Sequence, residues 1–246
     1  MVVLCVCLPS TMRPQSYEIS FRLFGFPTVI QPFFWLIALL IPALALGQID
    51  NMPLWIVQLM VGAVAIVLSI LVHELGHALS FRHIFRTPCV IVLHGMGGMA
   101  VPEYHRRRPG FAGAVAECFL AFSGPLAGFV LAFVAVLLYR AIPENLEGLP
   151  IFLLLYFLRW TIVISIFWGI LNLMPIYPMD GGRIARDVCV YLFPRQGIEL
   201  SLVLSMAVAI LLIALALQQN MFFVAILFGF FAYQNYQEWS FRSFRR

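Results

Sequence analysis

Long apolar runs, almost free of charged residues, constrain this sequence more than any other feature does. The 246-residue chain is 63% hydrophobic and 11% charged, with a mean hydropathy of +0.97. A soluble domain of this size carries roughly a quarter charged and about half apolar residues. No polar stretch is long enough to fold as a separate soluble domain. The sequence therefore predicts an integral membrane protein with a single domain over residues 1–246.

Six apolar runs are candidates for membrane helices, which need about 20 residues to cross the hydrocarbon core. The predicted spans are residues 31–46, 54–80, 111–139, 150–174, 200–217 and 221–233. We expect residues 24–30 to form a short strand or loop. Residues 89–93 have strand character, and residues 94–99 are too rich in glycine for a helix. The expected fold is an all-α polytopic membrane protein with about six transmembrane helices. A short membrane-associated β segment is expected between spans 2 and 3, and core spans at about 54–80, 111–139 and 150–174.

The arginines predict the orientation, because cytoplasmic flanks of membrane helices carry an excess of positive residues. If the N-terminus is inside, Arg140 is the one arginine that falls in the external loops. The arginines on the cytoplasmic side would be Arg13, Arg22, Arg82, Arg86, Arg106, Arg107, Arg108, Arg183, Arg186, Arg195, Arg242, Arg245 and Arg246. We therefore expect a multi-pass protein of the cytoplasmic (inner) membrane with both termini in the cytoplasm. Met12 is an alternative start to Met1.

The end of the second span contains the pattern HExxH, formed by His73, Glu74 and His77. Two histidines four residues apart share one face of a helix, about 6 Å apart along its axis. This spacing suits one zinc ion, with Glu74 placed to act as general base on zinc-bound water. The other interpretation is a hydrogen-bonded structural cluster. Ionisable groups are costly within a membrane span, and this cost favours a metal site.

A catalytic zinc needs a third protein ligand and an open position. Asp180 follows the fourth span in a segment where Pro175 and Pro178 end the helix and two glycines permit a sharp turn. Such a segment could return to the two histidines, or it could be an ordinary polar turn that leaves the membrane. The competing ligand is Glu117, which lies within the third span and could instead be a carboxyl buried at a helix contact. From the residues alone, both carboxylates remain candidates.

Two motifs in this order resemble the site-2 protease family of intramembrane zinc metalloproteases. The first is His73-Glu74-Leu75-Gly76-His77, and the second, about a hundred residues later, is Asn172-Leu-Met-Pro-Ile-Tyr-Pro-Met-Asp-Gly-Gly182. Met179 stands where the family usually has leucine. The resemblance extends to Phe24-Gly-Phe-Pro, Gly97-Gly98 and Ser123-Gly-Pro-Leu-Ala-Gly128, and so covers roughly residues 20–190.

The resemblance implies a compact metalloprotease that binds one Zn²⁺ per chain through His73, His77 and Asp180. It also implies roles for Asn172, Gly124 and Gly128 in supporting the substrate or the active site. Many relatives have asparagine where this chain has Gly128, a departure that concerns substrate handling rather than zinc binding. Gly124 and Gly128 also form a GxxxG pair, which is typical of close helix packing.

The function implied is an intramembrane zinc endopeptidase that cleaves transmembrane segments near the cytosolic side, as in regulated intramembrane proteolysis. The expected partners are a transmembrane protein or peptide substrate, the lipid bilayer and a regulatory membrane protein, because this length has no room for a PDZ or CBS domain. No nucleic-acid partner is needed to explain the arginines. The alternative is a non-proteolytic zinc-binding membrane scaffold, and retention of Glu74 argues against it. A transporter would show internal repeats and paired broken spans, which this sequence lacks.

Overall fold

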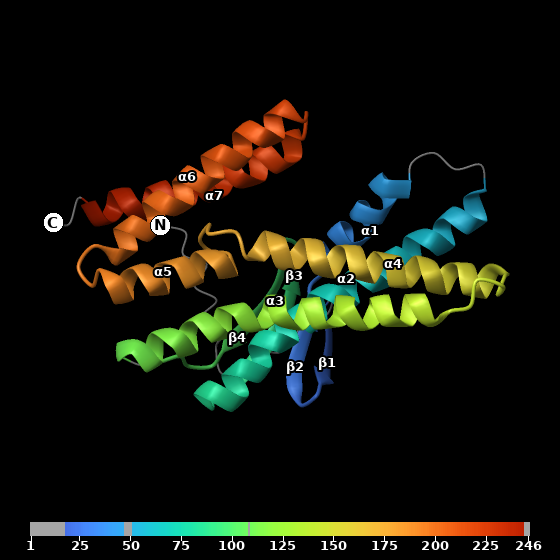
Figure 1. The fold of residues 1–246 in the computed structure, drawn as a ribbon, viewed down its shortest axis with the longest axis horizontal. Coiled ribbons are helices and arrows are strands. Elements are labelled where there is room, and N and C mark those ends of the chain that lie inside the picture. The colour runs from blue at the N-terminus through green and yellow to red at the C-terminus, as the bar shows by residue number, and fades with distance from the viewer. Residues whose placement is uncertain (1–17, 47–50, 108, 244–246) are drawn as a thin grey trace. The chain divides into compact units, whose positions relative to one another are not determined.

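The computed structural model describes residues 18–46, 51–107 and 109–243, which are mainly helical (Figure 1). Its elements are β1 (Ile19–Leu23), β2 (Phe26–Ile30), α1 (Pro32–Leu46), α2 (Met52–Ser80), the π-helical turn η1 (Phe81–Phe85), β3 (Cys89–His94), β4 (Gly97–Pro102), α3 (Gly110–Ala141), α4 (Leu149–Asn172), α5 (Asp180–Leu192), α6 (Gly197–Gln218) and α7 (Phe222–Ser243). These residues form two compact units. The first unit comprises residues up to 105 together with 127–166, and the second comprises 106–126 and 167 onward. The prediction of a single domain remains a prediction.

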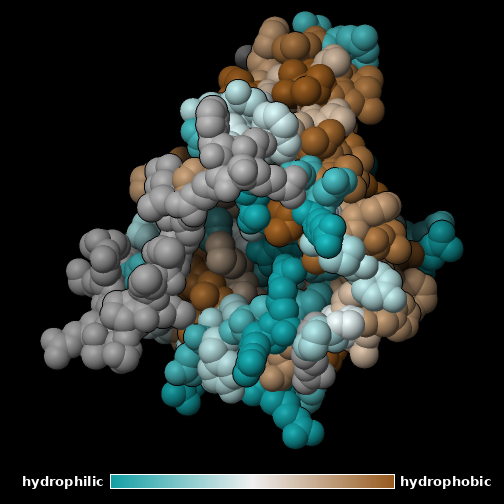
Figure 2. Space-filling view, turned by 90° about the vertical axis from the view of Figure 1, so that its left-hand side faces the viewer, coloured by the Kyte–Doolittle hydropathy of each residue, from teal (hydrophilic) through white to brown (hydrophobic). Residues whose placement is uncertain are grey.

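Four helices in the described part of the chain are long and apolar enough to cross a membrane. They are α2 continued by η1, α3, α4 and α6. Hydrophobic residues (brown) make up much of the exposed surface in Figure 2, as expected where lipid is the solvent. The chain is therefore a multi-pass membrane protein. The predicted spans at α1 and α7 are not among these four, so the count of six remains a prediction.

The first unit contains a four-stranded sheet with the order β1-β2-β3-β4. The outer pairs are antiparallel, and β2 runs parallel to β3, where Thr28 pairs with Ile91 and Ile30 with Leu93. Strands β3 and β4 lie between α2 and α3 in the sequence, where a β segment was predicted, and its association with the membrane remains a prediction. The sheet is larger than expected, because residues 19–30 form a hairpin that joins β3 from before the first helix.

Helix α2 begins at a well-defined cap and packs closely on α1. The Asn51 side chain accepts a hydrogen bond from the backbone N–H of Leu54 (3.2 Å), and Pro53 occupies the first turn, where its missing N–H costs nothing. A Cβ on Gly62 would lie 2.8 Å from the Cβ of Pro42 in α1. Glycine at this position therefore permits the close approach of α1 and α2.

The hairpin of β1 and β2 is tied to the end of α2 by Arg82 in η1. The Arg82 guanidinium donates a hydrogen bond to the carbonyl of Phe24 (3.1 Å) and lies 3.8 Å from the ring centroid of Phe26. Arg86 then ends the helical segment with a φ of +53°. This contact fixes the strand hairpin against the end of the helix that carries the HExxH motif.

The second unit is built around the antiparallel pair α6 and α7. Ile176, Ala209, Phe228 and Phe231 form its buried core. Helix α5 was not among the predicted elements, because it is short and carries charged residues between its apolar ones. Its end packs on the start of α6, where a Cβ on Gly197 would lie 2.3 Å from the carbonyl oxygen of Cys189. The last helix is also longer than the predicted span and continues to Ser243.

Candidate metal centre

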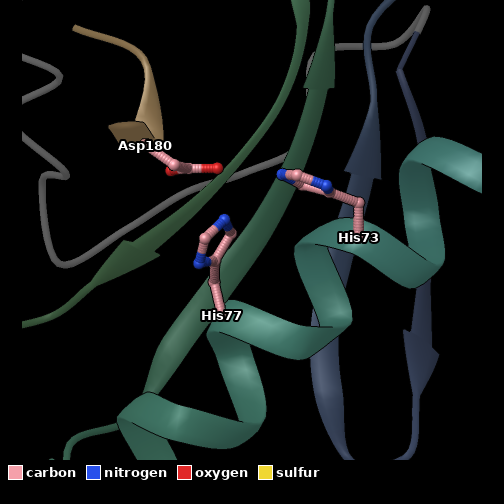
Figure 3. Close-up of side chains that lie close together, drawn as sticks. All are labelled: His73, His77 and Asp180. Atoms are coloured by element: carbon pink, nitrogen blue, oxygen red, sulfur yellow. The ribbon is translucent and has the colours of Figure 1, made fainter. Parts of the chain in front are cut away.

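His73 and His77 lie on successive turns of α2 and project from the same side of the helix (Figure 3). Their ring centroids are 5.1 Å apart and their planes make an angle of 75°. Both side chains are buried, at 2% and 6% exposure. The predicted pairing of the two imidazoles on one helix face is therefore present in the structure.

The helix is continuous through the motif, since no proline interrupts it after its first turn. Ser69, one turn before His73, donates a hydrogen bond to the carbonyl of Ala65 (2.8 Å). Its hydroxyl also accepts one from Ser165 of α4, at 3.1 Å. This contact between two buried hydroxyls fixes α2 against α4 close to the histidines.

Glu74 is also buried, at 4% exposure, and lies directly beside β4. A Cβ on Gly98 would fall 2.4 Å from the Cγ of Glu74 and 2.7 Å from its Oε1. A glycine at residue 98 is thus required for the carboxylate to occupy its position. The glycines at residues 97 and 98 belong to the segment predicted to be non-helical and to the family resemblance, but the contact of Gly98 with Glu74 was not predicted.

Asp180 belongs to the second unit, where it is the first residue of α5 and is 6% exposed. A carboxylate in the first turn of a helix is stabilised by the helix dipole. The backbone of this turn is packed tightly: a Cβ on Gly181 would lie 2.1 Å from the carbonyl oxygen of Leu173, and one on Gly182 would lie 2.3 Å from the carbonyl carbon of Ile176. The peptide bond between Tyr177 and Pro178 is cis. The two glycines therefore allow α5 to start against the preceding loop.

The three predicted ligands have the donor chemistry of a zinc site. Each is buried and offers one ligand atom: an imidazole nitrogen from His73, another from His77 and a carboxylate oxygen from Asp180. Catalytic zinc binds three nitrogen, sulfur or carboxylate ligands and keeps a fourth position open for water or substrate. The residues present therefore fit Zn²⁺.

Three further residues were predicted to support the site. Asn172 is the last residue of α4, and its side-chain amide donates to the carbonyl of Trp168 (2.9 Å), which caps its own helix. Gly124 and Gly128 are buried in α3. A Cβ on Gly128 would lie 3.5 Å from the carbonyl oxygen of Ser165, which is ordinary van der Waals contact. Gly128 therefore lies at the packing surface between α3 and α4.

Glu117, the competing ligand, is buried in α3 at 7% exposure. Its charge contributes to raising the pKa of Asp187 in α5, although burial of Asp187 is the main cause. Arg107 opposes this rise through an ion pair in which its guanidinium lies 2.6 Å from the Asp187 carboxylate. Glu117 thus belongs to an acidic region of the second unit that the sequence did not predict.

Both the sequence and the fold of this chain are similar to those of known proteins. The family model "Peptidase family M50" matches residues 149–215. The chain is 27% identical over 175 residues to the zinc metalloprotease MJ0392 of Methanocaldococcus jannaschii, which covers 71% of this chain and 46% of that protein. The chain thus spans about half the length of this curated relative. The solved structure of the site-2 protease from Methanocaldococcus jannaschii matches with a TM-score of 0.57 and 22% identity, covering 91% of this chain and 95% of that one.

The structural match establishes the shared fold, and the sequence matches connect the chain to zinc metalloproteases of peptidase family M50. The chain is therefore similar in fold to a site-2 protease and similar in sequence to zinc metalloproteases of this peptidase family.

Proposed function

We propose that the chain is an intramembrane zinc endopeptidase in which His73, His77 and Asp180 bind one Zn²⁺. The observation that carries this proposal is the burial of Glu74 between two buried histidines within an apolar helical segment of 34 residues. Ionisable residues are costly in membrane spans, and where they occur they commonly mark functional sites. Zinc ligation requires the histidines but not Glu74, so the retention of Glu74 favours catalysis over a scaffold role.

Glu74 serves as the general base and then as the general acid. A Zn²⁺ ion held by His73, His77 and Asp180 would supply Lewis-acid chemistry, polarising a peptide carbonyl and lowering the pKa of a water molecule. The Glu74 carboxylate accepts the proton of the attacking water and later delivers it to the nitrogen of the leaving amine. The contact with Gly98 of β4 limits the positions that this carboxylate can adopt, and so orients it for both transfers.

The proposed substrate is a transmembrane segment of a membrane-tethered protein, cut near the cytosolic side. Every backbone carbonyl of a membrane helix is hydrogen-bonded within the helix. The scissile bond must therefore be freed by local unwinding, which favours substrates with helix-weakening residues near the cut. The arginine distribution supports an inner-membrane location with cytoplasmic termini. The first 17 residues lie outside the described part of the chain.

The decisive experiment compares Glu74→Gln with Glu144→Gln, a substitution of the same type in an exposed loop. Purified proteins in detergent are tested for zinc content and for cleavage of a transmembrane peptide. We expect Glu74→Gln to retain zinc and to cleave about 10²- to 10⁴-fold more slowly, the usual contribution of a general base. The Glu144→Gln protein should match the wild type. Unchanged cleavage by a zinc-loaded Glu74→Gln protein would reject Glu74 as the general base and with it the proposed protease mechanism. A zinc-loaded wild type that does not cleave would favour the scaffold.

The identity of the third ligand is tested by the zinc content of Asp180→Asn and Glu117→Gln. The motif that surrounds Asp180 and its place in the first turn of α5 support Asp180. We expect zinc to be lost from Asp180→Asn and kept by Glu117→Gln. Loss of zinc only from Glu117→Gln would overturn this assignment.

A further inference from the structure

The loop before Asp180, residues 173–179 (the Tyr177 loop), is fixed at one peptide unit by side chains from two later helices. The backbone N–H of Tyr177 donates to the hydroxyl of Ser205 in α6 (3.1 Å), and the side-chain amide of Asn235 in α7 donates to the carbonyl of Tyr177 (2.6 Å). We infer that Ser205 and Asn235 are positioning residues of the metal centre, which hold the main chain that presents Asp180. This inference rests on the proposed function.

Both side chains are polar groups buried in α6 and α7, and both are hydrogen-bonded to the Tyr177 peptide. Ser205 is 0% exposed and Asn235 is 1% exposed. Each also bonds its own helix, Ser205 to the carbonyl of Ser201 (2.8 Å) and Asn235 to that of Phe231 (2.7 Å). A buried polar group is costly unless hydrogen-bonded, and removing one partner leaves the other unsatisfied. Ser205 and Asn235 thus satisfy the N–H and C=O of one loop residue in an apolar setting.

The side chains of the Tyr177 loop are fixed as well. Ile176 is fully buried in the core formed by α6 and α7. The Tyr177 ring lies under the guanidinium of Arg186, 3.6 Å from its centroid, and Arg186 pairs with Glu238 of α7 at 3.1 Å. A guanidinium stacked on a ring and paired with a carboxylate is held in one orientation. The loop is thus anchored to α7 through both its backbone and its tyrosine ring.

The chain between this anchor and Asp180 is short and stiff. Pro178 has a fixed φ, and the N–H of Met179 donates back to the carbonyl of Ile176 (2.8 Å). The contacts of Gly181 with the backbone of Leu173 leave no room for a compensating shift. A displacement of Tyr177 is therefore transmitted to the Asp180 carboxylate. Outer partners that orient a metal ligand contribute roughly 10- to 100-fold to metal affinity.

The experiment compares Ser205→Ala with Ser201→Ala. Both serines are buried on α6 and bond a carbonyl of their own helix, but the structure places only the Ser205 hydroxyl against Tyr177. Zinc affinity is measured by chelator competition, and the metal geometry is read from the visible absorption of the Co²⁺-loaded protein. We expect Ser205→Ala to bind zinc roughly 10- to 100-fold more weakly, with an altered Co²⁺ spectrum. Ser201→Ala should show wild-type affinity and spectrum.

Asn235→Leu tests the second anchor, with Gln237→Leu, an exposed amide on the same helix, as its control. The expected result is again weaker zinc binding and a changed Co²⁺ spectrum in Asn235→Leu alone. Thermal unfolding of the metal-free proteins separates positioning from general destabilisation. Affinity and spectrum in Ser205→Ala equal to those of Ser201→Ala would overturn the inference. Failure of the wild-type chain to bind Zn²⁺ would instead reject the proposed function.

Discussion

The two segments that carry the predicted zinc ligands are fixed in different ways. On α2, His73 and His77 are placed by the helix itself, because a spacing of four residues sets their separation. Asp180 is placed by contacts distant in the sequence, since the Tyr177 loop is bound by residues of α6 and α7. The four-residue spacing on one helix thus determines the positions of the two histidines, whereas tertiary packing determines the position of Asp180. Substitutions away from the ligands should therefore displace Asp180 more readily than they displace the two histidines.

The largest effect is expected from Gly181→Ala, beside Asp180. Its Cβ would lie 2.1 Å from the carbonyl oxygen of Leu173, which is backbone and cannot move aside. Overpacking of this kind costs about 1–3 kcal/mol or more, so we expect a lower unfolding temperature and loss of bound zinc. Zinc content and thermal unfolding in detergent provide the measurements.

Gly229→Ala is the control for this substitution. A Cβ on Gly229 in α7 would meet no atom within 4 Å. Alanine in a helix interior is favoured over glycine by up to about 1 kcal/mol, so this variant should be at least as stable as the wild type. Wild-type zinc content in Gly181→Ala would show that the close backbone contact does not position Asp180.

The next effect is expected from Gly98→Ala, beside Glu74. The neighbour here is a flexible side chain, with the added Cβ 2.4 Å from the Glu74 Cγ, so the carboxylate rather than the backbone must move. Both histidines keep their helix positions. We therefore expect zinc to be retained and cleavage to fall about 10²- to 10⁴-fold, as for loss of the general base.

A double variant isolates the cause of that loss. If Gly98→Ala acts by displacing Glu74, then adding it to Glu74→Gln should slow cleavage no further, because both changes remove the same group. A further decrease in the double variant would indicate that the β4 backbone acts on the substrate independently of Glu74.

The same contrast explains what the sequence could predict. The HExxH pair and the apolar spans at α2, α3, α4 and α6 follow from local spacing and composition, which need no tertiary information. The parallel pairing of β2 with β3 joins residues some sixty positions apart and has no local signature. Helix α5 was missed because it is short and amphipathic, and so does not form one of the long apolar runs that mark the membrane helices.

The positioning residues were missed for a related reason. Ser205 has a second serine, Ser201, one turn before it in α6, and Asn235 lies among Gln234, Gln237 and Glu238 in α7. Neither residue therefore stands out in the sequence. The partner of both, the Tyr177 peptide, is a backbone group and leaves no trace in the sequence.

A smaller effect is expected from Ser69→Ala on α2. The substitution removes the acceptor of the Ser165 hydroxyl, which lies 3.1 Å away in α4, and should lower the unfolding free energy by about 1–2 kcal/mol. Zinc affinity should not change, because the helix spacing still fixes His73 and His77. Ser123→Ala is the control, since that hydroxyl donates within its own helix. Weaker zinc binding in Ser69→Ala would show that α2 also needs tertiary contacts to hold its ligands.

The smallest effect is expected from Arg107→Gln in the second unit, and it depends on pH. Burial raises the pKa of Asp187, and the ion pair with Arg107 partly opposes that rise. Because the folded-state pKa lies above the unfolded value of about 3.9, stability falls as the pH rises from that value through the folded pKa. Removal of Arg107 raises the folded pKa further and destabilises only the ionised form.

The Arg107→Gln variant should therefore unfold like the wild type below about pH 4, where Asp187 is protonated in both states. Near pH 8 it should be less stable by about 1 kcal/mol or less, because the Arg107 side chain is 55% exposed and solvent screens the pair. Arg106→Gln, the neighbouring exposed cation, should show no such pH dependence. An equal loss at both pH values would mean that Arg107 stabilises the start of α3 by packing rather than by charge.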